Sequence, residues 1–140
     1  MFRTNVPEEA LKLGSGTMIR DIQYFTNYIY YKKSLPVYAH ELKTLLYENR
    51  TEEAERLKSK IRLTENSMKE IEALIENYNA GANERLFLRC RYIDGLTMEK
   101  TAEIMNVSRD TVFRLKKRIN RQIDFNYRSF LRASSAFPQE

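Results

Sequence analysis

Residues 97–117 carry the pattern that most constrains how this chain of 140 residues can fold. Ala102 is small at a place where two helices must cross closely, and Asn106 tolerates the left-handed backbone of a tight turn. Ser108 can cap a following helix by accepting a backbone N–H bond. The stretch therefore predicts two short helices joined by a turn, a helix-turn-helix unit, with a shared core of Met105, Val107, Val112 and Leu115.

The net charge of +5 lies entirely in the half of the chain that holds this pattern. Residues 1–83 contain 12 Lys or Arg and 12 Asp or Glu, whereas residues 84–140 contain 12 and 7. Within 109–132 the counts are 8 basic and 2 acidic residues. A concentrated basic face indicates a polyanionic partner, and nucleic acid fits best. On charge alone, the alternative is a helix face that only solvent covers.

The composition favours a folded helical chain and gives little support to an enzyme. Apolar residues make up 42%, with only four Gly and three Pro. No run of about 18 apolar residues predicts a membrane span, and the first residues lack an apolar signal core, so we expect a cytoplasmic protein. His40 and Cys90, each the single residue of its kind, make no metal-ligand set, and no phosphate loop or nucleophile–base pair stands out. We therefore expect no catalytic residue, no metal and no cofactor.

The N-terminal half is predicted to hold two helices after a loose lead-in over residues 1–14. The first would cover residues 18–33. Because proline disfavours helix in the residue before it, we expect a break around Pro36 and a second helix from Val37. One face of the first helix carries three tyrosines, for which packing is favoured over base stacking: Tyr24, Tyr28 and Tyr31.

A heptad seam follows, at alternating spacings of three and four residues. It predicts a helix from Thr51 to Tyr78. The partner of the seam is either the helix from Val37, in an antiparallel hairpin, or the same helix of a second subunit. Self-association through residues 54–78 is therefore one hypothesis. The seam consists of Ala54, Leu57, Ile61, Thr64, Met68, Ile71, Ile75 and Tyr78.

Residues 79–83 are the best candidate linker, with a unit boundary near Gly81. Asn83 is expected to cap a supporting helix that ends at Tyr92 and buries Leu86, Phe87 and Cys90 or a neighbouring face. The predicted organisation is all-α. An N-terminal helical or coiled-coil hairpin over 1–80 precedes a helix-turn-helix domain over 83–132 and a disordered tail over 133–140.

The helix-turn-helix pattern also assigns roles to side chains. Asp94-Gly95 predicts a tight turn, Thr97 a cap for the first helix, and Ser108 to about Ile123 the recognition helix. Side chains near the start of such a helix reach base edges in the major groove, and other cations contact phosphates. The expected base-reading residues are Arg109, Asp110, Phe113, Arg114 and Lys117. The expected phosphate contacts are Lys100, Ser108, Lys116, Arg118 and Arg121.

At these residues the chain resembles region 4 of bacterial sigma factors, which reads the −35 promoter element. The layout is also similar to that of small phage late-gene regulators of the ArpU/RinA type. Thr101 departs from the Ile or Val that is usual in the family, and Phe113 and Arg114 depart from its usual polar residues, so a base preference does not transfer. The matching runs are Glu84-Arg85-Leu86, Arg91-Tyr92-Ile93-Asp94-Gly95-Leu96-Thr97, Ala102-Glu103-Ile104-Met105 and Val107-Ser108-Arg109-Asp110-Thr111-Val112.

Three functions follow from this resemblance and from the N-terminal helices. The first is a regulator that binds double-stranded promoter DNA and touches RNA polymerase, encoded by a phage or prophage. It would be an activator and not a complete sigma factor, because nothing resembles the region that melts the −10 element. The second is a DNA-packaging adaptor of the small terminase type. The third is a protein-binding module that mimics or sequesters a sigma factor.

Overall fold

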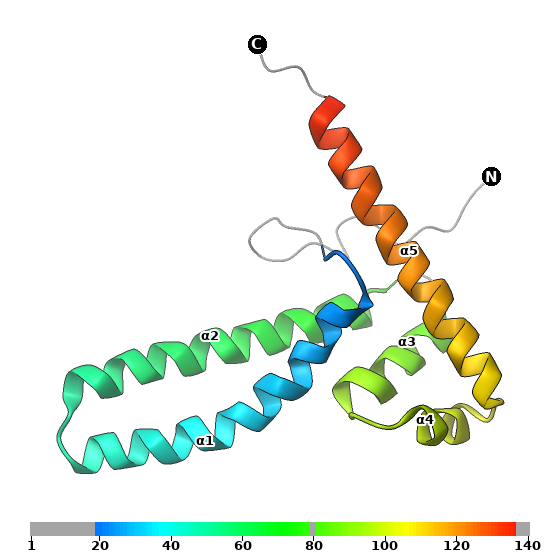
Figure 1. The fold of residues 1–140 in the computed structure, drawn as a ribbon. Coiled ribbons are helices and arrows are strands. Elements are labelled where there is room, and N and C mark those ends of the chain that lie inside the picture. Colours follow the sequence, from blue (N-terminus) through cyan, green and yellow to red (C-terminus); the bar gives the residue numbers. More distant parts are fainter. Residues whose placement is uncertain (1–18, 79–80, 137–140) are drawn as a thin grey trace.

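The computed structural model describes residues 19–78 and 81–136. Every regular element within these ranges is helical, which confirms the all-α prediction. In Figure 1 the two longest N-terminal helices form an arm, and the last helix rises from the compact part as one long rod. The elements are η2 (Ile22–Thr26, a 3₁₀ helix), α1 (Asn27–Tyr47), α2 (Thr51–Glu76), α3 (Ala82–Leu88), η3 (Arg89–Ile93, a π-helix), α4 (Met98–Met105) and α5 (Arg109–Ala136).

The expected helix break at Pro36 is wrong, because α1 runs through this residue without interruption. Proline has no N–H, so the carbonyl of Lys32 loses its partner four residues on. Packing along the whole length of α2 outweighs this local loss, since α1 contributes buried side chains on both sides of Pro36, Tyr28 and Leu45. The expected start of the first helix at residue 18 lies outside the described residues, and residues 22–26 form a 3₁₀ helix.

The predicted helix from Thr51 is confirmed as α2, and its heptad seam faces α1 within the same chain. Every seam residue is buried or half-buried. At the far end of the hairpin, Leu45 of α1 packs with Ala54 and Leu57 of α2 in a small cluster of its own. Of the two partners that the sequence left open, the structure has the antiparallel hairpin. A second subunit would have to bind other surfaces or displace α1.

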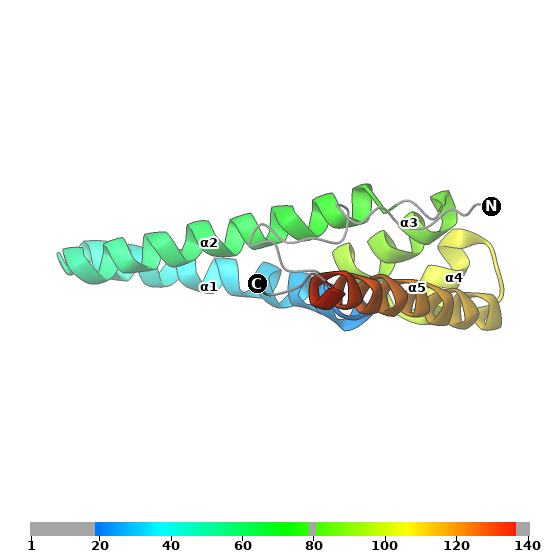
Figure 2. The same ribbon diagram turned by 90° about the horizontal axis from the view of Figure 1, so that it is seen from above.

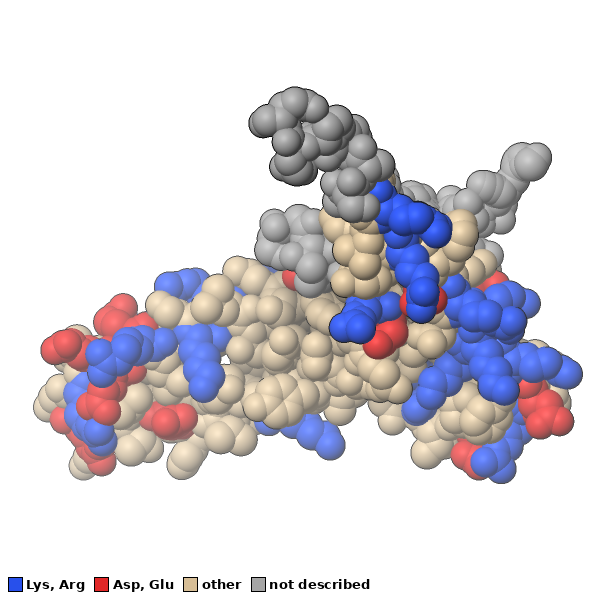
Figure 3. All heavy atoms as spheres, turned by 45° about the horizontal axis from the view of Figure 1, so that its top comes forward, with Lys and Arg blue, Asp and Glu red and all other residues tan. Residues whose placement is uncertain are grey.

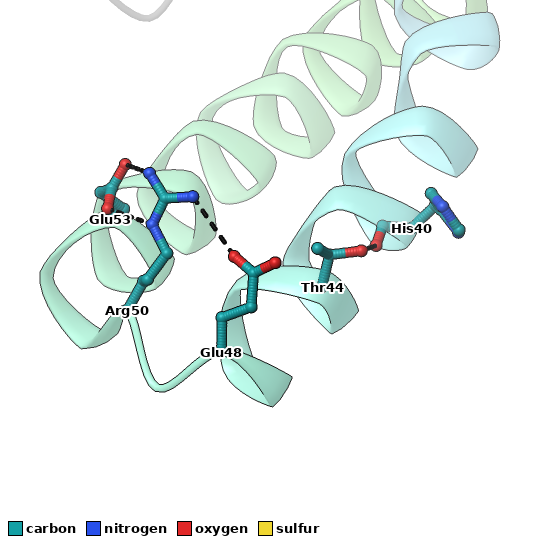
Figure 4. Close-up of polar contacts among 5 residues, drawn as sticks. All are labelled: His40, Thr44, Glu48, Arg50 and Glu53. Atoms are coloured by element: carbon teal, nitrogen blue, oxygen red, sulfur yellow. Dashed lines mark hydrogen bonds and ion pairs between the residues drawn. The ribbon is translucent and has the colours of Figure 1, made fainter.

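The turn between α1 and α2 is held by an arginine between two carboxylates. Arg50 donates from Nε to Oε1 of Glu53 at 2.7 Å and lies 3.3 Å from Oε1 of Glu48 (Figure 4). Hydrogen bonding to Arg50 lowers the pKa of the Glu53 carboxyl. Asn49 takes a left-handed backbone with φ of 59°, which asparagine tolerates better than most residues. In the last turns of α1, the Thr44 hydroxyl donates to the His40 carbonyl at 3.3 Å.

One hydrophobic core joins the open end of the hairpin to the helix-turn-helix. Figure 2 shows the hairpin extending to one side, with α3, α4 and α5 gathered at its open end. Phe25, Phe87 and Tyr92 pack ring against ring, with centroids 5.8 Å apart for Phe25–Tyr92 and 6.3 Å for Phe87–Tyr92. The two predicted units therefore share their interior. Other fully buried members of this core are Ile71, Ile75, Tyr78, Leu88, Val112, Ile119 and Ile123.

Two predicted boundaries need correction. Helix α3 begins at Ala82 with Gly81 as its N-cap, so Asn83 is inside the helix and does not cap it. Gly81 has φ of +140°, a conformation that L side chains rarely adopt, and this explains why the residue before the helix is a glycine. Helix α5 continues to Ala136, beyond the expected end of the recognition helix near Ile123, and Tyr127 and Phe130 pack against the core along this extension. The lead-in over 1–14 lies outside the described residues. Within the described residues, no helix is long and apolar enough to cross a membrane.

Candidate nucleic-acid interface

The turn between α4 and α5 has the geometry that its sequence predicts. Thr97 caps α4 by accepting from the Lys100 N–H at 3.1 Å. Asn106 ends α4 in the left-handed region, with φ of 58° and ψ of 47°. Ser108 then accepts from the Thr111 N–H at 3.1 Å at the start of α5. Both caps and the left-handed turn are therefore confirmed, and they set the direction in which α5 leaves α4.

The supporting helix is shorter than expected and continues as a π-helix. Phe87 and Cys90 are buried as predicted, whereas Leu86 is half-exposed and Leu88 takes its place in the core. Burial raises the pKa of the Cys90 thiol, which fits a packing role. After Asp94, Gly95 turns the chain with φ of +71°. These residues place α4 against the first half of α5.

A carboxylate on α3 fixes the near side of α5. The Glu84 side chain is only 10% exposed, and its Oε2 accepts from the Arg118 guanidinium at 2.7 Å. Arg118 was expected to contact phosphate, and the structure gives it this structural contact while leaving its side chain 58% exposed. No local sequence pattern indicates that Glu84 pairs with Arg118, because the two residues are 34 positions apart.

The two faces of α5 separate as the spacing predicts. Val112, Leu115 and Ile119 are buried, at 0%, 5% and 0% exposed. The opposite face is turned outward. All five expected base-reading side chains are exposed on it: Arg109, Asp110, Phe113, Arg114 and Lys117.

The first of these residues is held in place by its neighbours. The Arg109 guanidinium lies 3.3 Å from the Glu99 carboxylate of α4. It also lies over the ring of Phe113, with its central carbon 5.4 Å from the ring centroid. A cation above an aromatic face is attracted by the ring quadrupole. The pair of contacts orients Arg109 along the outward face of α5.

The expected phosphate contacts surround this face. Figure 3 shows Lys and Arg side chains gathered over α5, with few acidic side chains among them. Lys117 and Arg121 are exposed and Lys116 is half-exposed. Lys100 on α4 is exposed and lies 3.5 Å from Glu103. Ser108 is also exposed, although its hydroxyl is engaged as the helix cap.

The sequence missed one element of this surface. The N-terminal segment around η2 lies against the flank of α5, where the Ile22 N–H donates to Oδ1 of Asn120 at 2.9 Å. These residues are 98 positions apart, so no local pattern signals the contact. The predicted tyrosine face, by contrast, packs as expected, with Tyr28 buried and Tyr24 and Tyr31 against the core. Burial raises the pKa of Tyr24 and of Tyr28 to about 12 in each case.

Thr101 is fully buried, and its hydroxyl has no hydrogen-bond partner among the residues that the structure describes. We expect Thr101→Val to raise the free energy of unfolding by about 1–2 kcal/mol, because an unsatisfied buried hydroxyl is removed at nearly constant shape. Urea unfolding followed by circular dichroism measures this. Thr97→Val is the matched control and should lower stability by about 1 kcal/mol through loss of the cap. A destabilised Thr101→Val variant would mean that the hydroxyl is satisfied in solution.

Within the described part of the chain, no three His, Cys, Asp or Glu side chains are grouped so that they could hold a metal ion. Of the buried titratable side chains here, Glu84 is paired with Arg118 and Tyr92 is packed in the core. The chemistry that the surface offers is a set of guanidinium and ammonium donors around one aromatic ring.

Comparison with known families gives one match. Residues 82–123 match the family model described as sigma-70, region 4. No curated protein matched the chain, and no solved structure did. The matched residues run from the start of α3 to the last core residue of α5 and include both caps and the left-handed turn. This part of the chain is similar to sigma region 4, which is a DNA-binding helix-turn-helix module.

Proposed function

Because residues 82–123 form a sigma region 4-like helix-turn-helix, we propose that this protein binds promoter DNA sequence-specifically and regulates transcription together with RNA polymerase. The observation that carries the proposal is the exposed face of α5. Five side chains of the kinds that contact bases or phosphates project from a helix whose opposite face is fixed in the core. Such a helix can enter a major groove without rearrangement.

The start of α5 is the part that reads bases. Arg109 and Arg114 supply bidentate donors of the kind that recognise guanine, and each is worth about 1–3 kcal/mol of discrimination. Asp110 accepts from cytosine or orients Arg109, and Phe113 lies where it can contact a thymine methyl group. Lys117 completes the set. Lys100, Ser108, Lys116, Arg118 and Arg121 then hold the phosphates on either side.

The hairpin is assigned to a protein partner. It points away from the helix-turn-helix (Figure 1). Its sequence has no excess of positive charge. It exposes apolar side chains, with Val37 63%, Leu63 67% and Tyr47 90% exposed. RNA polymerase is the partner that a sigma-like module implies. A phage or prophage late-gene activator combines these two activities in one small chain.

We expect Arg114→Ala and Arg109→Ala each to weaken binding to the preferred site about tenfold or more while the fold stays intact. Both side chains are exposed, so their removal opens no cavity. Fluorescence anisotropy with labelled duplexes measures the affinity, and circular dichroism checks the fold. Arg62→Ala, on the hairpin, is the matched control and should bind like the unmodified protein. Unchanged affinity of both α5 variants would remove the recognition-helix assignment.

The target is found by incubating the purified protein with sheared source-genome DNA and sequencing what it retains. Sharp peaks just upstream of genes support a promoter-binding regulator, and their symmetry gives the number of half-sites. A single peak within a packaging gene favours the small terminase type of adaptor. No enrichment over bulk DNA favours a protein-binding module, whose binding surface would be the exposed apolar side chains of the hairpin.

A further inference from the structure

A groove lies between the N-terminal segment and the recognition helix. It has a volume of about 320 Å³ and is open to solvent. The two sides of the groove are joined by a hydrogen bond of 2.9 Å from the Ile22 N–H to Oδ1 of Asn120. Its walls come from η2 and the residue before it on one side and from α5 on the other. The polar and aromatic residues that line it are Asp21, Gln23, Phe113, Lys116, Lys117 and Asn120.

The groove opens onto the face of α5 that is assigned to DNA. Phe113 and Lys117 line the groove and also belong to the outward face of the helix. When that face lies in a major groove, the flank of α5 that carries Lys116 and Asn120 is beside the sugar–phosphate wall. Gln23 is exposed on the opposite wall of the groove, so in this docking geometry it would lie near the same strand.

The donors in the groove suit a phosphodiester oxygen. Lys116 and Lys117 bring ammonium groups, and Gln23 brings an amide. The Oδ1 atom of Asn120 is taken by the Ile22 N–H, which leaves its Nδ2 atom as a donor. Asp21 opposes an anion, although its carboxylate is engaged as the cap of η2 by the Gln23 N–H at 2.9 Å.

We infer that this groove holds a phosphate of the DNA backbone, so that residues 21–23 are part of the DNA-binding surface. The inference rests on the proposed function and extends it beyond the residues that match the sigma family. The N-terminal segment then has two roles, since the same η2 that seats the hairpin on α5 also contacts the bound strand. A phosphate at this place lengthens the footprint on one side of the recognition helix.

Proximity is tested with a chelate that cleaves DNA. The chain has one cysteine, and Cys90 is only 2% exposed, so a Gln23→Cys variant can be labelled selectively with an iron–EDTA reagent. Ser59→Cys, exposed on the hairpin, is the matched control. With a duplex recovered from the genome, we expect strand cleavage inside the footprint for labelled Gln23→Cys and none for labelled Ser59→Cys.

Contact is tested by changing charge at the groove. Gln23→Glu adds a like charge and should weaken binding about fivefold, the size of one charge pair about 4 Å apart in water. Asp21→Asn removes the opposing charge, keeps a good helix cap and should strengthen binding by about the same factor. Asn66→Asp and Glu65→Gln exchange amide and carboxylate in the same two directions at exposed positions of α2 and should leave the affinity unchanged.

The outcomes separate this inference from the proposed function. The groove is overturned as a phosphate site if the footprint is normal but labelled Gln23→Cys cleaves no DNA and Gln23→Glu and Asp21→Asn bind like their controls. That result leaves the DNA-binding function standing. If the unmodified protein gives no sequence-specific footprint at all, the proposed function fails first. Cleavage together with opposite shifts of the two groove variants supports the site.

Discussion

The logarithm of the DNA-binding constant is expected to fall with the logarithm of salt concentration at a slope near −5, for five to six neutralised phosphates. Between about 50 and 200 mM salt this is a loss of affinity of roughly a thousandfold. The reason is the release of counterions condensed on the duplex when cations of α5 and Lys100 take their place. A titration of labelled duplex at four salt concentrations gives the slope.

Single variants refine this result. Arg121→Gln removes one exposed cation of α5 and should flatten the slope by about 0.9, whereas Arg56→Gln on the hairpin should leave it unchanged. A slope near zero for the unmodified protein would exclude α5 as a DNA-binding face. Equal flattening by both variants would mean that net charge acts at long range without a defined set of contacts.

Replacing Phe25 by alanine is expected to lower the free energy of unfolding by about 3–5 kcal/mol, the range for a fully buried phenylalanine. Phe25 is 0% exposed and lies between the hairpin and the helix-turn-helix, with its ring centroid 5.8 Å from that of Tyr92. Phe125→Ala removes the same atoms from a side chain that is 54% exposed and is the matched control. Its effect should stay within about 0.5 kcal/mol.

The helices that Phe25→Ala destabilises are as informative as the size of the change in the free energy of unfolding. Because one core joins the two parts, Phe25→Ala should speed amide hydrogen exchange in α5 as well as in α1 and α2. Mass spectrometry of peptides from each helix measures this. Faster exchange confined to the hairpin, with α5 unchanged, would contradict a shared core and favour two units that fold independently.

Local sequence signals predicted the helix-turn-helix closely, except that Val107, which was expected in the shared core, is exposed. Thr97, Asn106 and Ser108 each act within three or four residues of chain, so their residue types were sufficient to predict two caps and a left-handed turn. The inward spacing of Val112, Leu115 and Ile119 is also a local property of one helix. For the same reason the sequence was sufficient to predict the exposed face of α5. The contacts of this face with DNA stay a prediction.

Features that depend on distant parts of the chain were not predicted. The sequence around Pro36 favours a break, and only the packing of α1 along α2 explains its absence. The Glu84–Arg118 pair and the Ile22–Asn120 bond join residues 34 and 98 positions apart, and single-residue patterns contain no signal for either. The groove beside α5 could not be inferred for that reason, since one of its walls comes from the other end of the chain.

The uninterrupted α1 turns the hairpin into a spacer of fixed length. A helix of 21 residues is about 32 Å long, close to one turn of B-form DNA. The base of the hairpin is joined to α5 through η2 and the shared core, so the tip lies at a fixed distance and in a fixed direction from α5. If α5 reads bases as proposed, a protein bound at the tip would lie about one helical turn from the recognised site, at a separation that the length of the hairpin determines.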